Sequence, residues 1–136
     1  MELVDIIDEN GNLTGEVLDK KEAHEKKKLH NIVACFIIDG KGKILLQLRS
    51  KKKSLAAEKI GTVAGHVKSK EDLSSAIIRE LNEEIGLNVG NDEVKPIGEK
   101  ELAIREKEAH ILNFYYLLKE INIEELTINK EEFIIS

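Results

Sequence analysis

The chain has 136 residues, of which 41% are hydrophobic, and a formal net charge of −5. This length suits one domain, residues 1–136, with a core large enough for a sheet covered by helices. The negative charge argues against a nucleic-acid polymer as partner, so local positive charge or a metal must hold any anionic ligand. The single cysteine, Cys35, excludes an internal disulfide, and no secretory or membrane-spanning segment is visible, which together predict a cytoplasmic protein.

The N-terminal residues predict a hairpin followed by a short helix. Apolar residues at 3–8 and 16–18 flank Asn10 and Gly11, a dipeptide typical of a tight turn between two strands. Next, a short capped helix is predicted from four residues: Asp19, Glu22, Ala23 and His24.

Most of the remaining apolar runs predict strands. Residues 31–38 form a buried run, and Asp39 and Gly40 are expected to turn it back into a second strand at 43–48. Shorter or alternating runs predict four more strands, at 62–64, 96–105, 109–118 and 133–135. Because a long helix interrupts these strands, we expect a mixed α/β layer fold.

One long helix is predicted between residues 69 and 86. Ser69 followed by Asp72 is typical of a capped start, and Gly86 is typical of a helix end. At helical spacing its apolar residues fall on one arc: Leu73, Ile77, Ile78, Leu81 and Ile85.

The acidic residues of this helix are not on the side opposite the apolar arc. Glu80 and Glu84 fall at its edge, and Glu83 lies further round. Carboxylates this close repel one another by about 3 kcal/mol per pair at 5 Å, so a positive charge is expected among them. Mg²⁺ or Mn²⁺ suits such oxygen ligands, and Arg79 is placed to hold Glu83 by a two-pronged hydrogen bond. The alternative is an exposed charged helix without a ligand.

The segment from Gly65 to Leu87 carries the most specific pattern in the chain. Glu71 follows Gly65 by six residues, and the run 79–87 then reads Arg-Glu-Leu-Asn-Glu-Glu-Ile-Gly-Leu. This pattern resembles the Nudix box at every fixed position. The resemblance implies an α/β Nudix fold, in which a mixed β-sheet is sandwiched between α-helices (α/β/α). It also implies a metal-dependent hydrolase that cleaves a diphosphate linkage in a small molecule.

The same resemblance implies roles for individual residues. Mg²⁺, or Mn²⁺, would be held by the carbonyl of Gly65 and the carboxylates of Glu80, Glu83 and Glu84. We expect Glu80 to act as the base that activates water, and Arg79 to fix a ligand carboxylate. The family does not always take its base from the box, which leaves four later residues as candidates: Glu99, Glu101, Glu106 and Glu108.

Further residues resemble the branch of Nudix proteins related to isopentenyl diphosphate isomerase. They include Val4-Asp5, Ala23-His24, His30, residues 45–53 and the run Ala64-Gly65-His66. In that branch an Arg and a Lys four residues later bind the substrate diphosphate, which here would be Arg49 and Lys53, as a guanidinium and an ammonium group can clamp a diphosphate. The alternative is a solvated basic loop.

The histidines are open to two interpretations. The resemblance implies a metal site at His24, His30 and His66, together with carboxylates that would fall near Glu108 and His110. The match is imperfect, because His110 replaces a carboxylate and the gap between His24 and His30 is one residue short. The alternative is a set of ordinary surface or hydrogen-bonded histidines, among which His66 is the best candidate for contact with substrate.

The isomerase reaction is the first alternative to hydrolysis, and a module that binds a nucleotide without cleaving it is the second. In the isomerase a cysteine precedes the Gly-His pair, whereas this chain has Ala64, whose methyl group can do no acid–base chemistry. Cys35 falls in an expected core strand and cannot replace it. Hydrolysis is therefore favoured. The substrate is open, as are a homodimer and whether the end at Ser136 shortens the family's domain.

Overall fold

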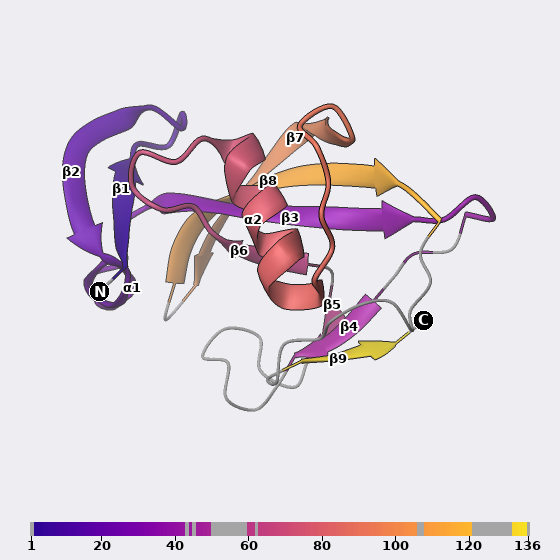
Figure 1. Ribbon diagram of the computed structural model, residues 1–136. Coiled ribbons are helices and arrows are strands. Elements are labelled where there is room, and N and C mark those ends of the chain that lie inside the picture. The colour runs from indigo at the N-terminus through magenta and orange to yellow at the C-terminus, as the bar shows by residue number, and fades with distance from the viewer. Residues whose placement is uncertain are drawn as a thin grey trace.

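The central element is a four-stranded mixed sheet. The computed structural model describes residues 2–42, 44, 46–49, 60–61, 63–105, 108–120 and 132–135. The strand order is β6-β3-β8-β7, in which β3 and β8 run parallel and the other pairs are antiparallel. The four strands are β3 (His30–Ile38), β6 (Val63–His66), β7 (Val94–Arg105) and β8 (Glu108–Leu118). The mixed sheet predicted from the sequence is confirmed (Figure 1).

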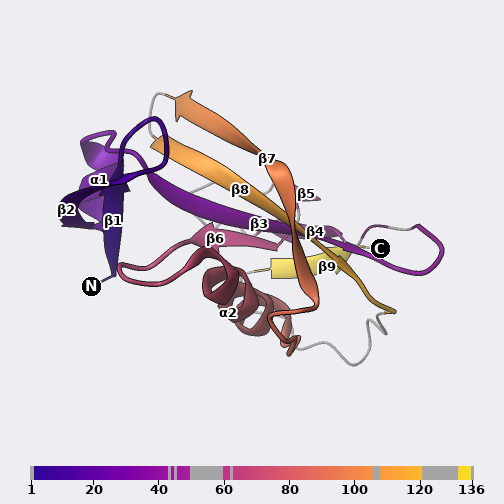
Figure 2. The ribbon, with the colours of Figure 1, turned by 90° about the horizontal axis from the view of Figure 1, so that it is seen from above.

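The N-terminal hairpin forms as predicted and lies at one end of this sheet (Figure 2). It consists of β1 (Leu3–Ile7) and β2 (Leu13–Asp19), and its turn contains Gly11 at φ 84°. The short helix α1 (Lys20–Glu25) follows, although Asp19 makes no side-chain capping hydrogen bond. The hairpin and α1 share a small apolar core made of Val4, Ile6, Leu18 and Ala23.

The strand expected to return alongside β3 is only partly formed. After a turn in which Gly42 N–H donates to Asp39 O (3.1 Å), a single bridge joins Ile38 and Ile44. The chain then enters a separate three-stranded sheet of order β5-β4-β9. Its strands are β4 (Leu46–Arg49), β5 (Ile60–Gly61) and β9 (Glu132–Ile135). The predicted strand at 43–48 is thus confirmed at residues 46–48, which pair with β5 and β9 rather than with β3.

The long helix α2 spans Leu73–Ile85. Its N-cap is Asp72, whose carboxylate accepts from Ser75 N–H at 2.7 Å, so the predicted start at Ser69 is wrong by three residues. Gly86 ends the helix in the left-handed conformation (φ 70°), as predicted, and its N–H donates to Asn82 O. A glycine adopts this backbone conformation at low energetic cost.

Helix α2 packs against one face of the central sheet (Figure 2). Ile77, Leu81 and Ile85 are fully buried there, as the predicted apolar arc requires. They contact residues that alternate along β3 and β8, among them Val33, Cys35, Ile37, Tyr115 and Leu117. Each buried aliphatic side chain contributes about 1.5–3 kcal/mol, which fixes α2 relative to β6 and β3. In the described part of the chain, no helix has the length and apolar character needed to span a membrane.

Candidate active site

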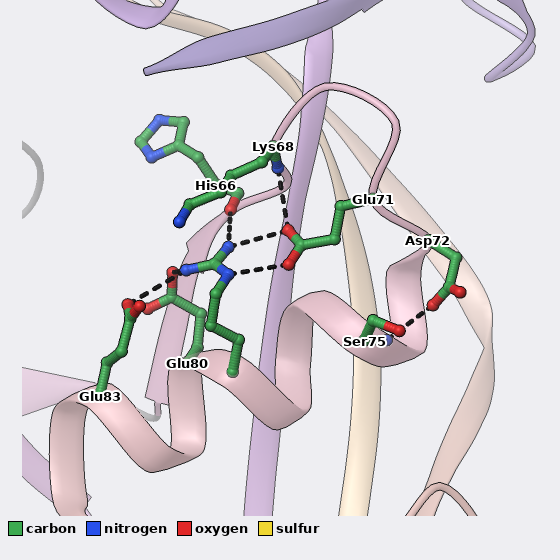
Figure 3. A network of polar contacts seen from close by, with 8 residues as sticks. His66, Lys68, Glu71, Asp72, Ser75, Glu80 and Glu83 are labelled. Carbon is green, nitrogen blue, oxygen red and sulfur yellow. Dashed lines mark hydrogen bonds and ion pairs between the residues drawn. The ribbon is translucent and has the colours of Figure 1, made fainter. Parts of the chain in front are cut away.

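Arg79 lies at the centre of a network of carboxylates on α2 and on the loop before it. Its partners Glu71, Glu80 and Glu83 are labelled in Figure 3. Its Nε donates to Glu71 Oε2 at 2.8 Å and its Nη2 to Glu71 Oε1 at 2.9 Å. This is the two-pronged arrangement that orients a carboxylate most firmly. The sequence placed that arrangement on Glu83, which is wrong: Glu83 receives one hydrogen bond, from Nη1 at 3.1 Å.

The same guanidinium joins three segments of the chain. Its Nη1 also donates to Glu80 Oε1 at 2.8 Å, and its Nη2 donates to the backbone carbonyl of His66 at 2.9 Å. Strand β6, the loop carrying Glu71 and helix α2 are therefore tied together by one side chain. Arg79 thus acts as a positioning residue for the carboxylates around it.

The charges of this network shift the pKa values of its members. Burial alone would raise the pKa of Glu71, but hydrogen bonds from Arg79 and from Lys68 N–H outweigh it, and the pKa is lowered. The hydrogen bond with Glu71 in turn raises the pKa of Arg79 above its usual value. Both groups are therefore charged at neutral pH. One guanidinium shared by three carboxylates leaves this group with net negative charge, which favours a bound cation.

Glu80 and Glu84 are buried although they are acidic, with 9% and 3% of their surface exposed. This confirms the prediction that they lie at the edge of the apolar arc. Glu80 lies directly against Gly65, and a Cβ atom at that position would collide with the Glu80 carboxyl group. The glycine of the motif is therefore required for space. Glu83, in contrast, is exposed to solvent.

The residue types at this site fit a hard divalent cation. Carboxylate oxygens, such as those of Glu80, Glu83 and Glu84, and a backbone carbonyl, such as that of Gly65, are the donors that Mg²⁺ and Mn²⁺ prefer. The network also orients Glu80 and Glu83 through Arg79. The kinds of donor group present, rather than a measured spacing between them, therefore favour the predicted metal site.

A second cluster, the histidine cluster, consists of His24, His30 and His66. One ring nitrogen from each lies within 4.8 Å of those of the other two, and the Nε2 atoms of His24 and His66 are 2.8 Å apart. The His30 ring is fully buried and its Nδ1 is 3.0 Å from Lys28 O, whereas its Nε2 has no hydrogen-bond partner among the described residues. His30 is therefore not a surface histidine, whereas the contacts of His24, His30 and His66 agree with the alternative of hydrogen-bonded histidines, so the metal site stays a prediction.

His110 borders this cluster, with its ring centre 6.4 Å from that of His30. Burial lowers the pKa of His30 to about 4 and that of His66 to about 2. Both rings are therefore neutral at pH 7, which is the form that binds metal ions. The His66 ring is turned away from Glu71, Glu80 and Glu83, while its carbonyl faces them (Figure 3).

Several predicted residues cannot be assigned a place in the site. Lys53 and Glu106 lie outside the described residues, and only the backbone is described for Arg49, at the end of β4. The same holds for the other candidate bases, Glu99, Glu101 and Glu108, on β7 and β8. Diphosphate binding by Arg49 and Lys53 therefore stays a prediction.

The sequence interpretation missed the role of Glu71. It is a fixed position of the motif, but it lies in the loop before α2, eight residues from Arg79, so helical periodicity could not pair them. Cys35 lies in β3 among core residues, and burial raises the pKa of its thiol to about 12. The prediction that this thiol is buried in the core is confirmed.

Comparison with known proteins assigns the chain to a family. The model of the NUDIX domain matches residues 28–134, so the chain belongs to the NUDIX family. The predicted fold class is confirmed with it. A Deinococcus radiodurans protein, DR0079, has a crystal structure that superimposes with a TM-score of 0.76 at 21% identity, covering 97% of this chain and 79% of that one.

Two sequence relatives differ in their names. The chain is 34% identical over 97 residues to isopentenyl-diphosphate Delta-isomerase 1 of Photorhabdus laumondii, a match that covers 70% of this chain and 54% of the isomerase. It is 27% identical over 139 residues to an uncharacterized Nudix hydrolase of Listeria monocytogenes, covering 97% of this chain and 76% of the relative. The chain thus spans about half the length of the isomerase.

Proposed function

We propose that the protein is a Mg²⁺-dependent hydrolase that cleaves a diphosphate linkage in a nucleoside diphosphate derivative or a related organic diphosphate. The supporting observation is the network in which Arg79 gathers Glu71, Glu80 and Glu83 beside Gly65. A solvated charged helix would not bury Glu80 and Glu84, so the alternative of an exposed charged helix without a ligand is disfavoured.

In this proposal each residue has a distinct task. Gly65, Glu80, Glu83 and Glu84 hold Mg²⁺, which when bound neutralises charge on the diphosphate oxygens and makes water more acidic. Glu80 accepts the proton of the attacking water as the bridging P–O bond breaks. Arg79 keeps the carboxylates in place through Glu71 and the His66 carbonyl. Arg49 and Lys53 are proposed to hold the diphosphate.

The histidine cluster is proposed as a second metal site. Its donors are neutral imidazole nitrogens, which suit Zn²⁺ and similar ions better than Mg²⁺. The closeness of the three rings and the buried Nε2 of His30 support this assignment. His66 belongs to this cluster through its ring and to the carboxylate network through its carbonyl, so the two sites are adjacent.

Isomerase activity on isopentenyl diphosphate is the alternative that the relatives' names suggest. The histidine cluster is consistent with it. However, Ala64 stands before Gly65 and cannot exchange a proton, and Cys35 is buried on the face of β3 that packs against α2. A module that only binds a nucleotide would not need the complete set of acidic residues, so this second alternative is also disfavoured.

A substrate panel tests the proposal. Nucleoside diphosphate derivatives, dinucleoside polyphosphates and isopentenyl diphosphate would be incubated with Mg²⁺, and phosphate release and acid lability of the product would both be measured. We expect Mg²⁺-dependent cleavage of at least one phosphoanhydride, which Glu83→Gln and Glu84→Gln abolish and the surface variant Glu93→Gln preserves. Turnover that persists in both site variants, or an acid-labile product without cleavage, contradicts the proposal.

A further inference from the structure

The loop between β6 and α2 is held from outside by the N-terminal hairpin. Asp5, on β1, accepts two hydrogen bonds from this loop: one from Ser69 Oγ to Oδ1 at 2.6 Å and one from Lys70 N–H to Oδ2 at 3.0 Å. A third comes from Ser69 N–H to the Leu3 carbonyl at 2.8 Å. Sixty-four residues separate Asp5 from Ser69, so this contact depends on the tertiary fold.

The held loop has a conformation that needs support. Lys70 adopts φ 66°, in the left-handed region that non-glycine residues rarely occupy. The Asp5 carboxylate binds the N–H of this residue, so it stabilises the unusual backbone directly. The next residue is Glu71, whose carboxylate accepts from Lys68 N–H at 3.0 Å and from Arg79. The conformation at Lys70 therefore sets the direction in which Glu71 leaves the loop.

The hairpin that carries Asp5 is itself firmly anchored. Val4 and Ile6, the neighbours of Asp5 on β1, are buried in the small apolar core beneath the hairpin. Ile7 N–H also donates to Leu29 O at 2.9 Å, which ties the end of β1 to the segment before β3. Because its neighbours cannot move freely, Asp5 is a fixed point from which the loop is held.

We propose that Asp5 is a positioning residue for the carboxylate site: through Ser69 and Lys70 it sets the loop that directs Glu71 onto Arg79, and so holds Glu80 and Glu83 ready for the metal. The inference rests on the proposed function. Asp5 lies before residue 28, where the NUDIX match begins, and outside the run from Gly65 to Leu87. The N-terminal hairpin thus becomes part of the catalytic apparatus although no residue of it belongs to the motif.

The test compares three variants of the hairpin by their affinity for Mn²⁺, measured by electron paramagnetic resonance. The site in question is the Mn²⁺ component that Glu84→Gln removes. Asp5→Ala should weaken this component about tenfold, as loss of an outer-shell partner typically does. Asp5→Asn should stay within about twofold of wild type, because an amide oxygen can still accept from Lys70 N–H and the Ser69 hydroxyl can reverse its role.

The matched control is Thr14→Ala, which removes another hydrogen bond of the same hairpin, from Thr14 Oγ1 to Ile6 O at 2.9 Å. This variant should lose thermal stability as Asp5→Ala does, yet keep the wild-type Mn²⁺ affinity. If Thr14→Ala and Asp5→Ala weaken Mn²⁺ binding equally, Asp5 stabilises the hairpin in general and does not position the carboxylate site. An Asp5→Asn variant as weak as Asp5→Ala would point to charge rather than to hydrogen bonding.

Equal weakening in Thr14→Ala and Asp5→Ala overturns the inference, and so does equal weakening in Asp5→Asn and Asp5→Ala. An unchanged affinity of Asp5→Ala for Mn²⁺ overturns it as well. Failure of the proposed function gives a different pattern. If the Mn²⁺ spectrum of Glu84→Gln lacks no component that the wild-type spectrum contains, the proposed function and the inference are overturned together. Wild-type binding that depends on Glu84 but not on Asp5 overturns the inference alone.

Discussion

The carboxylate network and the histidine cluster are neighbouring sites of opposite design. The first is charged, partly exposed and contained in one stretch of sequence from Gly65 to Glu84, apart from the support it receives from Asp5. The second is neutral, largely buried and assembled from α1, β3 and β6. The difference teaches that a local motif can gather carboxylates around one guanidinium, whereas the meeting of three imidazole rings depends on strand register.

The largest effect is expected at the residue that organises the carboxylates. Arg79→Ala leaves Glu71, Glu80 and Glu83 without their shared guanidinium, so they repel one another and lose direction. We expect kcat to fall by about 100-fold and the Mg²⁺ requirement to rise. Steady-state kinetics would show this, with Lys26→Ala, which breaks an exposed ion pair on α1, as the control that keeps full activity. Comparable losses in both variants would contradict the role of Arg79.

The space beside Glu80 gives the next largest effect. In Gly65→Ala the new methyl group would collide with the Glu80 carboxyl group and displace it. We expect about tenfold lower activity and, from overpacking, a loss of about 1–3 kcal/mol in the free energy of unfolding. Gly98→Ala on β7 is the matched control, because a Cβ there meets no atom within 4 Å. If Gly65→Ala has wild-type kinetics, Glu80 is not held as described.

The histidine cluster predicts a pH dependence that the carboxylates do not. The pKa of His30 is lowered from 6.5 to about 4 by burial, so the unfolded chain binds a proton that the folded metal-free protein rejects. The contribution of His30 to stability is therefore complete above pH 6.5 and is lost as the pH falls towards 4, by about 3 kcal/mol. His66, whose pKa burial also lowers, adds a loss of the same sign. Urea unfolding of metal-free protein between pH 7 and 4.5 measures the sum. His30→Gln should make the profile less steep, and an equally steep profile in that variant would refute the role of His30.

Cys35 provides the smallest effect and a check on the isomerase alternative. Burial raises the pKa of its thiol to about 12, so it is protonated and inaccessible at neutral pH. We expect alkylation by iodoacetamide only after unfolding, and unchanged activity in Cys35→Ala. Rapid labelling of the folded protein would show that this thiol is available for chemistry.

The sequence could predict contacts between residues that are close along the chain, but not contacts between distant segments. Helical periodicity was sufficient to place Glu80 and Glu84 at the edge of the apolar arc. The predicted helix start at Ser69 is wrong, because the Ser69 hydroxyl donates its hydrogen bond to Asp5. Asp72 caps the helix instead. Helical periodicity failed for the partner of Arg79, because Glu71 reaches it from a loop whose shape only the fold determines.

The histidine cluster required still more distant information. His30 and His66 meet because β3 and β6 pair with Ile32 opposite His66, and His24 arrives from α1. Residue spacing along the chain carries no trace of that register, so the sequence left these residues undecided. The cytoplasmic location stays a prediction, and the identity of the substrate and a homodimer stay open.

The most direct test of the account is a crystal structure with Mn²⁺, with the ion located by its anomalous scattering. We predict an ion at about 2.0–2.3 Å from carboxylate oxygens of Glu80, Glu83 and Glu84, beside the Gly65 carbonyl, as hard cations bind. Density for Mn²⁺ among the histidines alone, with none at Glu80, Glu83 and Glu84, would contradict the central claim.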